Sequence, residues 1–473
     1  MTRLQPRLAF IPQDLNLIVL WLTQRIIPLL LRLRLRSWLP SGISHIQVNH
    51  IEILVNLYQQ FQAGKIRFLM AFRHPEVDDP LCMFYVLSRL VPEAARQQGV
   101  ALKFPVHTHF VYDRGMPLWA GWLLGWFFSR LGGIPIHRGK RPDRTGLRVA
   151  RELFVNGQLP IAIAPEGATN GHSELVSPLE PGVAQLSFWC LEDLAKAQRQ
   201  ETVFIVPVSI RYHYPRPPWG NLDKLLRQLE QDTGLPTPPP PPGADQTPFF
   251  YKRLFHLGEH VLSEMEDFYR RFYHQELPVL DPSHYEDENA LLAARLQRLL
   301  NIALQVAETY FAIAPQGNLS ERCRRIEEAG WRYIYREEIK SQAELESLSP
   351  FTRGLGDWVA QEAVIRMRHM RLVESFVAVT GTYVREKPSI ERLAETTLIL
   401  FDMIARVKGE ELPCRPRLGW RHATITIGNP LSVSDRWHTY QSSRSAARQA
   451  VAELTQDLQR ALEAMVEKGG VAE

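Results

Sequence analysis

The sequence has few cysteines, little net charge and no long uninterrupted apolar run. Its four cysteines are scattered over 473 residues and form no CxxC pair. They indicate neither a clustered metal site nor a secreted disulfide framework, and they favour a reducing compartment. A net charge of only +4 argues against a strongly basic nucleic-acid-binding protein. Hydrophobic residues make up 45% of the chain, which is enough for a sizeable core, and the length exceeds one ordinary domain.

The N-terminal segment is rich in Leu, Ile and Trp, but arginines interrupt it. A membrane-spanning helix needs about twenty mostly apolar residues, and residues 15–39 contain Arg25, Arg32 and Arg36, which fall on one side of a helix. No small-residue cleavage site follows, so a secretory signal is not indicated. We interpret this segment as an amphipathic helix that lies on anionic lipid without crossing it. The alternative is a helix packed on the protein's own core.

A histidine and an aspartate lie five positions apart where the first strand-like apolar run ends. This run covers residues 66–72, and His74 and Asp79 follow it. Asp79 could hold one ring nitrogen while the other accepts a proton. No serine or cysteine accompanies the pair, so a nucleophile would come from the substrate, as in a transferase. The alternative is structural, since an aspartate before Pro80 is also a typical helix N-cap.

Two more predicted strands end in polar residues. The segment 132–138 reads as a turn, a short strand and a basic end at Arg138, which could bind phosphate or carboxylate. The apolar run 159–164 leads into Glu166. Ligands bind at the carboxyl ends of the strands in a parallel sheet, so His74, Arg138 and Glu166 are expected to converge on one edge.

Histidines and aromatic residues between these strands favour structural or lipid-contacting roles. His107 and His109 lie on one face of a predicted strand, but no third metal ligand is evident nearby, so a structural role is favoured. Residues 117–131 form an aromatic helix that is either buried or dipped into lipid.

Four motifs, in this order, resemble the glycerophospholipid acyltransferase family, which lysophosphatidic acid acyltransferases typify. The first, His-x-x-x-x-Asp, is matched by His74 and Asp79. The second is matched by residues 132–138, the third, Pro-Glu-Gly, by 165–167, and the fourth by the Val-Pro-Val of 206–208. Each motif is weak alone, whereas four in order are specific.

The resemblance implies that His74 deprotonates the acceptor hydroxyl while Asp79 orients it. A fatty acyl group would pass from acyl carrier protein or coenzyme A to a hydroxyl of a glycerolipid or lysolipid, with no metal and no cofactor beyond this co-substrate. The partners would be a membrane lipid surface, the lipid acceptor and, with that donor, acyl carrier protein, but not nucleic acid. The protein would be peripheral or monotopic on the cytoplasmic face of a membrane. Substrate binding would involve Arg138, Glu166, Gly167 and Thr169.

The third motif departs from the family pattern. Thr169 stands where the family has arginine, and Glu180 stands near a turn where lysine is frequent. These departures leave Arg138 as the remaining cation, which predicts acceptors without a terminal phosphomonoester. They also leave open a catalytically inactive lipid-surface protein of the same fold. A helical scaffold is a third possibility.

The domain organisation follows from proline and from hydrophobic periodicity. Proline-rich stretches at 215–219 and 236–242 mark a linker. Strand character returns at 423–431, before a final helix. We therefore predict an α/β fold with a mostly parallel sheet flanked by helices, a large all-α insertion and an N-terminal interfacial helix. A helix over 46–61 is expected before the first strand. The predicted parts are 1–45, 46–214, 215–418 and 419–473, with insertion helices over 249–275, 289–313, 319–335, 357–379 and 390–408.

Overall fold

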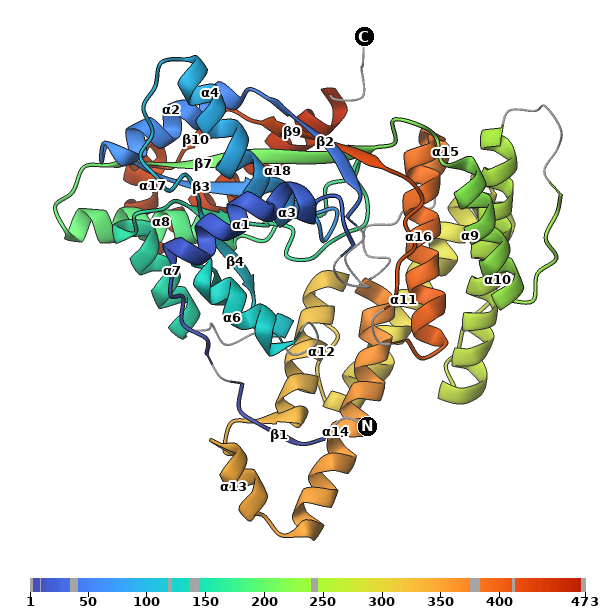
Figure 1. The fold of residues 1–473 in the computed structure, drawn as a ribbon. Helices are drawn as coiled ribbons and strands as arrows, with labels where there is room; N and C mark the ends of the chain where they lie inside the picture. Colours follow the sequence, from blue (N-terminus) through green and yellow to red (C-terminus); the bar gives the residue numbers. More distant parts are fainter. Residues whose placement is uncertain are drawn as a thin grey trace. The chain divides into compact units, whose positions relative to one another are not determined.

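The computed structural model describes residues 3–8, 10–34, 41–117, 121–136, 144–239, 246–374, 383–410 and 413–468. The chain forms two compact units. The first contains Ile11–His137, Asp143–Pro217 and Gly419–Glu473, and the second consists chiefly of Pro218–Leu418 together with Met1–Phe10. The first unit is built on a β-sheet and the second on helices (Figure 1). The predicted fold class, a mostly parallel α/β sheet plus a large helical region, is confirmed.

The sheet of the first unit has eight strands, and its path runs β2-β9-β7-β3-β6-β4-β5. Neighbours from β7 to β5 are parallel, whereas β9 is antiparallel to β7 and parallel to β2, and the short β10 pairs antiparallel with β7. The strands are β2 (Ile43–Asn49), β3 (Ile66–Phe72), β4 (His109–Asp113), β5 (Ile134–Ile136), β6 (Ile161–Ile163), β7 (Thr202–His213), β9 (Arg421–Ile427) and β10 (Leu431–Ser432).

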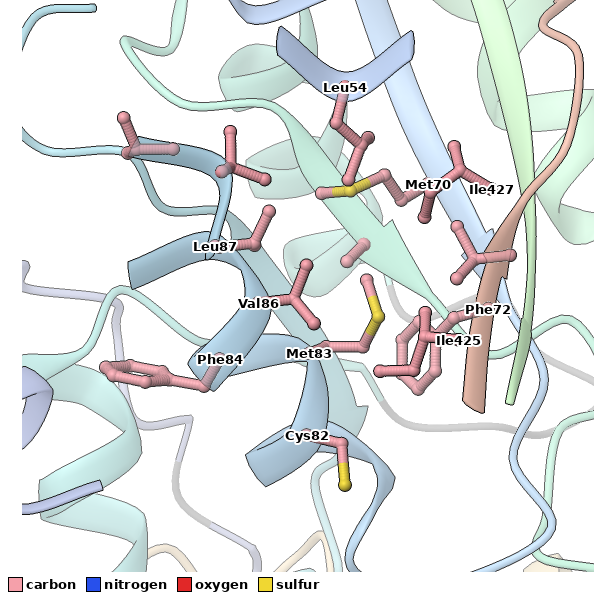
Figure 2. Packing of buried hydrophobic residues seen from close by; sticks show 14 of the residues in the cluster. Leu54, Met70, Phe72, Cys82, Met83, Phe84, Val86, Leu87, Ile425 and Ile427 are labelled. Carbon is pink, nitrogen blue, oxygen red and sulfur yellow. The ribbon is translucent and has the colours of Figure 1, made fainter. Parts of the chain in front are cut away.

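Helices cover both faces of this sheet, which explains why β3 reads as a continuous apolar run. Its residues alternate, so Met70 and Phe72 pack into one core cluster while Leu69 and Ala71 pack into the other. Figure 2 shows part of the first cluster, where Met83 of α3 lies near Phe72. The helices are α1 (Leu17–Leu30), α2 (Ile51–Gln62), α3 (Asp79–Tyr85) and α4 (Val91–Gln97) on the first face, α7 (Arg144–Asn156), α8 (Gly182–Lys196), α17 (Trp437–Ser442) and α18 (Arg444–Lys468) on the second, and α6 (Trp122–Arg130).

The expected helix over 46–61 is wrong in its first part. Residues Ile43–Asn49 form the edge strand β2, and the helix α2 begins only at Ile51. The reason is pairing at long range, because β2 runs beside β9, with Ile46 opposite Ala423. A segment of mixed polarity becomes a strand when a distant strand supplies its hydrogen-bond partners.

The second unit is helical, as predicted. Its long helices begin and end within three residues of the expected positions, except that α14 begins seven residues before 357 and the expected end at 379 lies outside the described residues. Three described helices of this unit were not predicted, namely α9 (Trp219–Asp232), α13 (Gln342–Ser347) and α15 (Tyr383–Glu386). The interval between the two proline-rich stretches contains α9, which buries Leu222, Leu225 and Leu229 at helical spacing. The helices are α9 (Trp219–Asp232), α10 (Gln246–Tyr273), α11 (Glu288–Phe311), α12 (Leu319–Ile334), α13 (Gln342–Ser347), α14 (Pro350–Glu374), α15 (Tyr383–Glu386) and α16 (Ile390–Val407).

Candidate active site

The end of β3 and the start of α3 bring His74 and Asp79 together. His74 Nδ1 lies 3.0 Å from Asp79 Oδ2. The His74 side chain is 21% exposed and the Asp79 side chain is fully buried. Since an ionised carboxylate only accepts hydrogen bonds, Nδ1 is the ring nitrogen that donates, and this contact assigns the tautomer. Nε2 is therefore the atom that can accept a proton from a substrate.

Asp79 occupies the first turn of α3, but its carboxylate does not cap the helix. The residue in the N-cap position is Asp78, whose side chain makes no capping bond. The Asp79 carboxylate instead accepts hydrogen bonds from the Glu76 backbone N–H at 2.8 Å and the Tyr212 hydroxyl at 2.5 Å. Burial raises the pKa of Asp79, and the hydrogen bonds from His74 and Tyr212 oppose that rise. The Asp79 carboxylate therefore does not make the contact that the helix-cap alternative requires.

A second buried carboxylate, Asp78, links this turn to the last part of the chain. Asp78 accepts from the backbone N–H of Ser41 at 3.0 Å and from Arg421 Nη2 at 2.8 Å. The guanidinium of Arg421 also lies 4.7 Å from the ring centre of Tyr212. Burial raises the pKa of Asp78 to about 6, with Arg421 acting in the opposite direction. Burial alone would lower the pKa of Arg421, but the charges of Glu76 and Asp78 outweigh it and hold that pKa above its usual value.

Arg421 is the first residue of β9, beyond the helical unit in sequence. The returning strand thus supplies a charge that fixes the turn between β3 and α3.

Glu166 lies at the end of β6, beside the end of β3, and its carboxylate points into the protein. It accepts a hydrogen bond from the backbone N–H of His74 at 3.0 Å. Two donors in its own loop, the side-chain amide of Asn170 and the backbone N–H of Ser177, also bond to it, both at 2.9 Å. Its position supports a role in holding the backbone of His74.

The other predicted binding residues lie in different surroundings. Gly167 has a backbone φ of +80°, a conformation that favours glycine, and its N–H donates to the carbonyl of Ala164. Thr169 is exposed. Arg138 lies outside the described residues. The structure therefore brings His74, Asp79 and Glu166 together.

Arg73, which precedes the histidine, was not singled out by the sequence analysis. Its fully buried guanidinium donates to the carbonyls of His172 at 3.0 Å and Ser173 at 2.5 Å. It lies 3.5 Å from Glu166 Oε1. Three converging backbone carbonyls, with Leu175 as the third, accept from its two terminal nitrogens and fix the loop after β6 against the end of β3. The sequence signal that could have identified Arg73 is its position directly after a buried strand.

His107 and His109 are structural in the sense expected from the sequence. His107 Nε2 lies 2.9 Å from the carbonyl of Leu131, and His109 Nδ1 lies 2.7 Å from that of Gly132. Burial lowers the pKa of His107 to about 4 and also lowers that of His109. Both rings are therefore neutral donors that join β4 to the turn before β5.

Chemically, the site offers a base oriented by a buried carboxylate. In the part of the chain that the structure describes, no serine or cysteine side chain hydrogen bonds to His74. The arrangement suits proton removal from a hydroxyl supplied by a substrate.

Comparisons with known proteins agree with this chemistry. A search of curated proteins found no match. The model of the family described as Acyltransferase matches residues 52–211, from the second residue of α2 to the last part of β7. The predicted resemblance is thus confirmed over this part of the chain. Residues 52–211 are an acyltransferase-family domain, and the protein is an acyltransferase of the glycerolipid type.

Proposed function

We propose that the protein moves a fatty acyl group from a thioester of acyl carrier protein or coenzyme A directly to a hydroxyl of a glycerolipid or lysolipid. His74 Nε2 would take the hydroxyl proton as the oxygen attacks the thioester carbonyl carbon. The C–S bond then breaks, and the imidazolium returns the proton to the departing thiolate. The observation that carries this proposal is the 3.0 Å contact between His74 and the fully buried Asp79. Direct transfer between these partners needs no metal or redox cofactor.

The number of cationic side chains available to bind a phosphate limits the class of acceptor lipid. The position of the family's third-motif arginine is Thr169, which is exposed, and Glu180 stands near the following turn, with its N–H bonded to the Pro165 carbonyl. A phosphomonoester carries nearly two negative charges and is held best by several cations. This supports acceptors such as a lysolipid diester, a lysoglycolipid or a free lipid alcohol.

We expect such acceptors to be used at least tenfold more efficiently than lysophosphatidic acid. The measurement is kcat/KM for each acceptor with one thioester donor. In Thr169→Arg, which restores the cation, the ratio should shift toward lysophosphatidic acid. If the unaltered protein uses lysophosphatidic acid best, and Arg138→Ala removes that preference, the inference from missing charges is wrong.

An exposed apolar surface on α1 and α6 supports attachment to a membrane. Six side chains of α1 and three of α6 are at least 45% exposed, namely Leu17, Ile18, Trp21, Leu22, Ile26, Leu29, Trp122, Leu123 and Trp126. The opposite side of α1 buries Leu20 and Ile27 in the core, so the helix both packs on the protein and presents apolar residues. The ends of the two helices are joined, since Asn16 N donates to the Arg130 carbonyl at 2.8 Å.

We propose that this surface rests on lipid at the cytoplasmic face of a membrane, in a peripheral or monotopic manner. Guanidinium groups lie beside its tryptophans, with Arg25 4.8 Å from the Trp21 ring centre, where anionic headgroups would be in reach. Among the described residues, no helix is long and apolar enough to cross a membrane.

The double substitution Leu22→Glu with Ile26→Glu should weaken binding to vesicles that contain anionic lipid by at least tenfold. Both side chains are about half exposed, so the change removes apolar area from the lipid contact without disturbing the core. Co-sedimentation with vesicles is the measurement. Leu355→Glu, at a similarly exposed residue of α14, is the matched control, and equal loss in both variants would contradict the proposed surface.

A further inference from the structure

An apolar cavity lies within the helical unit. Its volume is about 120 Å³, several times the roughly 10–15 Å³ that one water molecule requires on this measure. It is lined by α10, α11, α15 and α16 and by Leu372 at the end of α14. No charged side chain occurs among its described lining residues. The cavity is partly open to solvent, and a concave apolar surface of this kind is favourably covered by an apolar ligand.

The lining of the cavity extends along α10. On α10 its lining residues recur at every third or fourth position from Tyr251 to Met265. At 1.5 Å per residue this stretch is about 21 Å long. One leaflet of a bilayer is about 15 Å deep, half of the roughly 30 Å hydrocarbon core, so the apolar lining on α10 is long enough to contact a whole lipid chain.

Gly258 lies in the middle of this stretch and leaves space in it. A Cβ added there would meet no heavy atom within 4 Å. Glycine weakens a helix interior, yet it stands halfway along the 28-residue helix α10. A side chain at this position would project into the region that the cavity occupies.

The few polar groups at the cavity do not all have partners. The Tyr251 hydroxyl donates to Asn289 Oδ1 at 2.8 Å. In contrast, Thr396 Oγ1 is buried and has no hydrogen-bond partner among the described residues. An unsatisfied buried hydroxyl is costly, and it could bond to one polar group on an otherwise apolar ligand.

We propose that the helical unit binds one long hydrocarbon chain in this cavity, of the kind carried by a fatty acid, a fatty acyl thioester or a lysolipid. Leu254, Val261, Leu296 and Met403 would enclose the chain, and Thr396 would bond to an oxygen of its polar end. The proposed chain-binding site is separate from the acyl-transfer reaction, and the proposal does not depend on whether His74 acts as a base.

The test is a fluorescence titration of the full-length protein with cis-parinaric acid, a fluorescent fatty acid, in the His74→Ala background. Gly258→Leu should weaken binding by at least tenfold, because the new side chain fills the cavity. Gly354→Leu is the matched control, since Gly354 also lies in a helix and has no heavy atom within 4 Å of an added Cβ. Competition by palmitic acid, palmitoyl-coenzyme A and a palmitoyl lysolipid then distinguishes the sources of the chain. Equal affinity in the two glycine variants overturns the proposal.

A second measurement covers the case in which Gly258→Leu does not fold. Palmitic acid bearing a photoreactive diazirine is crosslinked to the unaltered protein, and the labelled peptides are identified by mass spectrometry. Label in α10, α11 or α16 supports the site, and Thr396→Val should reduce affinity for palmitic acid but not for decane. Label confined to the α/β unit overturns the proposal, whether or not acyl transfer is observed.

Discussion

Replacement of His74 by alanine should lower the rate of acyl transfer by about a hundred- to ten-thousand-fold, the usual contribution of a positioned general base. The loss should appear in kcat, because the base acts in the chemical step rather than in binding. Folding should change little. The side chain is partly exposed, and alanine keeps the backbone N–H that donates to Glu166. Initial rates with a thioester donor and a thermal unfolding curve are the two measurements.

The matched control is His438→Ala, at an exposed histidine of α17, which should retain normal turnover. Near-normal turnover in His74→Ala would contradict the role of His74 as base. A covalent acyl-enzyme trapped by rapid quench would contradict direct transfer, because the proposed reaction never places the acyl group on the protein.

Much of the fold could be predicted from local patterns because its central strands are buried on both faces. The apolar runs that became β3 and β6 are short, and polar turns follow them, so their type and end were evident. The edge strand β2 was missed for the opposite reason. It is only half buried, and its partner β9 lies more than 370 residues further along the chain. No local window contains that pairing.

Contacts of the site between residues close in sequence could be predicted, whereas contacts between residues far apart in sequence could not. His74 and Asp79 occupy one turn, so their spacing alone suggested the contact that the structure contains. Tyr212 lies 133 residues from Asp79, and Arg421 lies 343 residues from Asp78. Tyr212 shares its face of β7 with Val208 and Ile210, which pack in the same core as α3, and this alternation places its hydroxyl beside Asp79. Only the sheet order reveals that relation.

Tyr212→Phe should shift the acid limb of the pH profile of kcat/KM to higher pH and reduce the rate less than loss of the aspartate does. The hydroxyl hydrogen bond lowers the pKa of Asp79, so its removal raises that pKa. The ionised carboxylate is then lost at a higher pH on acidification. A uniform fall in rate with no change in the profile would indicate that Tyr212 acts only in packing.

Asp79→Asn should approach the loss seen in His74→Ala, because every known partner of this carboxylate is a donor. His74 Nδ1–H, the Tyr212 hydroxyl and the Glu76 N–H all donate to Asp79. An asparagine side chain has one acceptor oxygen and an NH₂ group, so it must direct a donor at one of them, and it cannot balance the imidazolium charge. We expect a rate lower by about a hundredfold or more, with residual activity from binding and positioning. If Asp79 were only a helix cap, asparagine would serve almost equally well, so near-normal turnover in Asp79→Asn would establish the structural role instead.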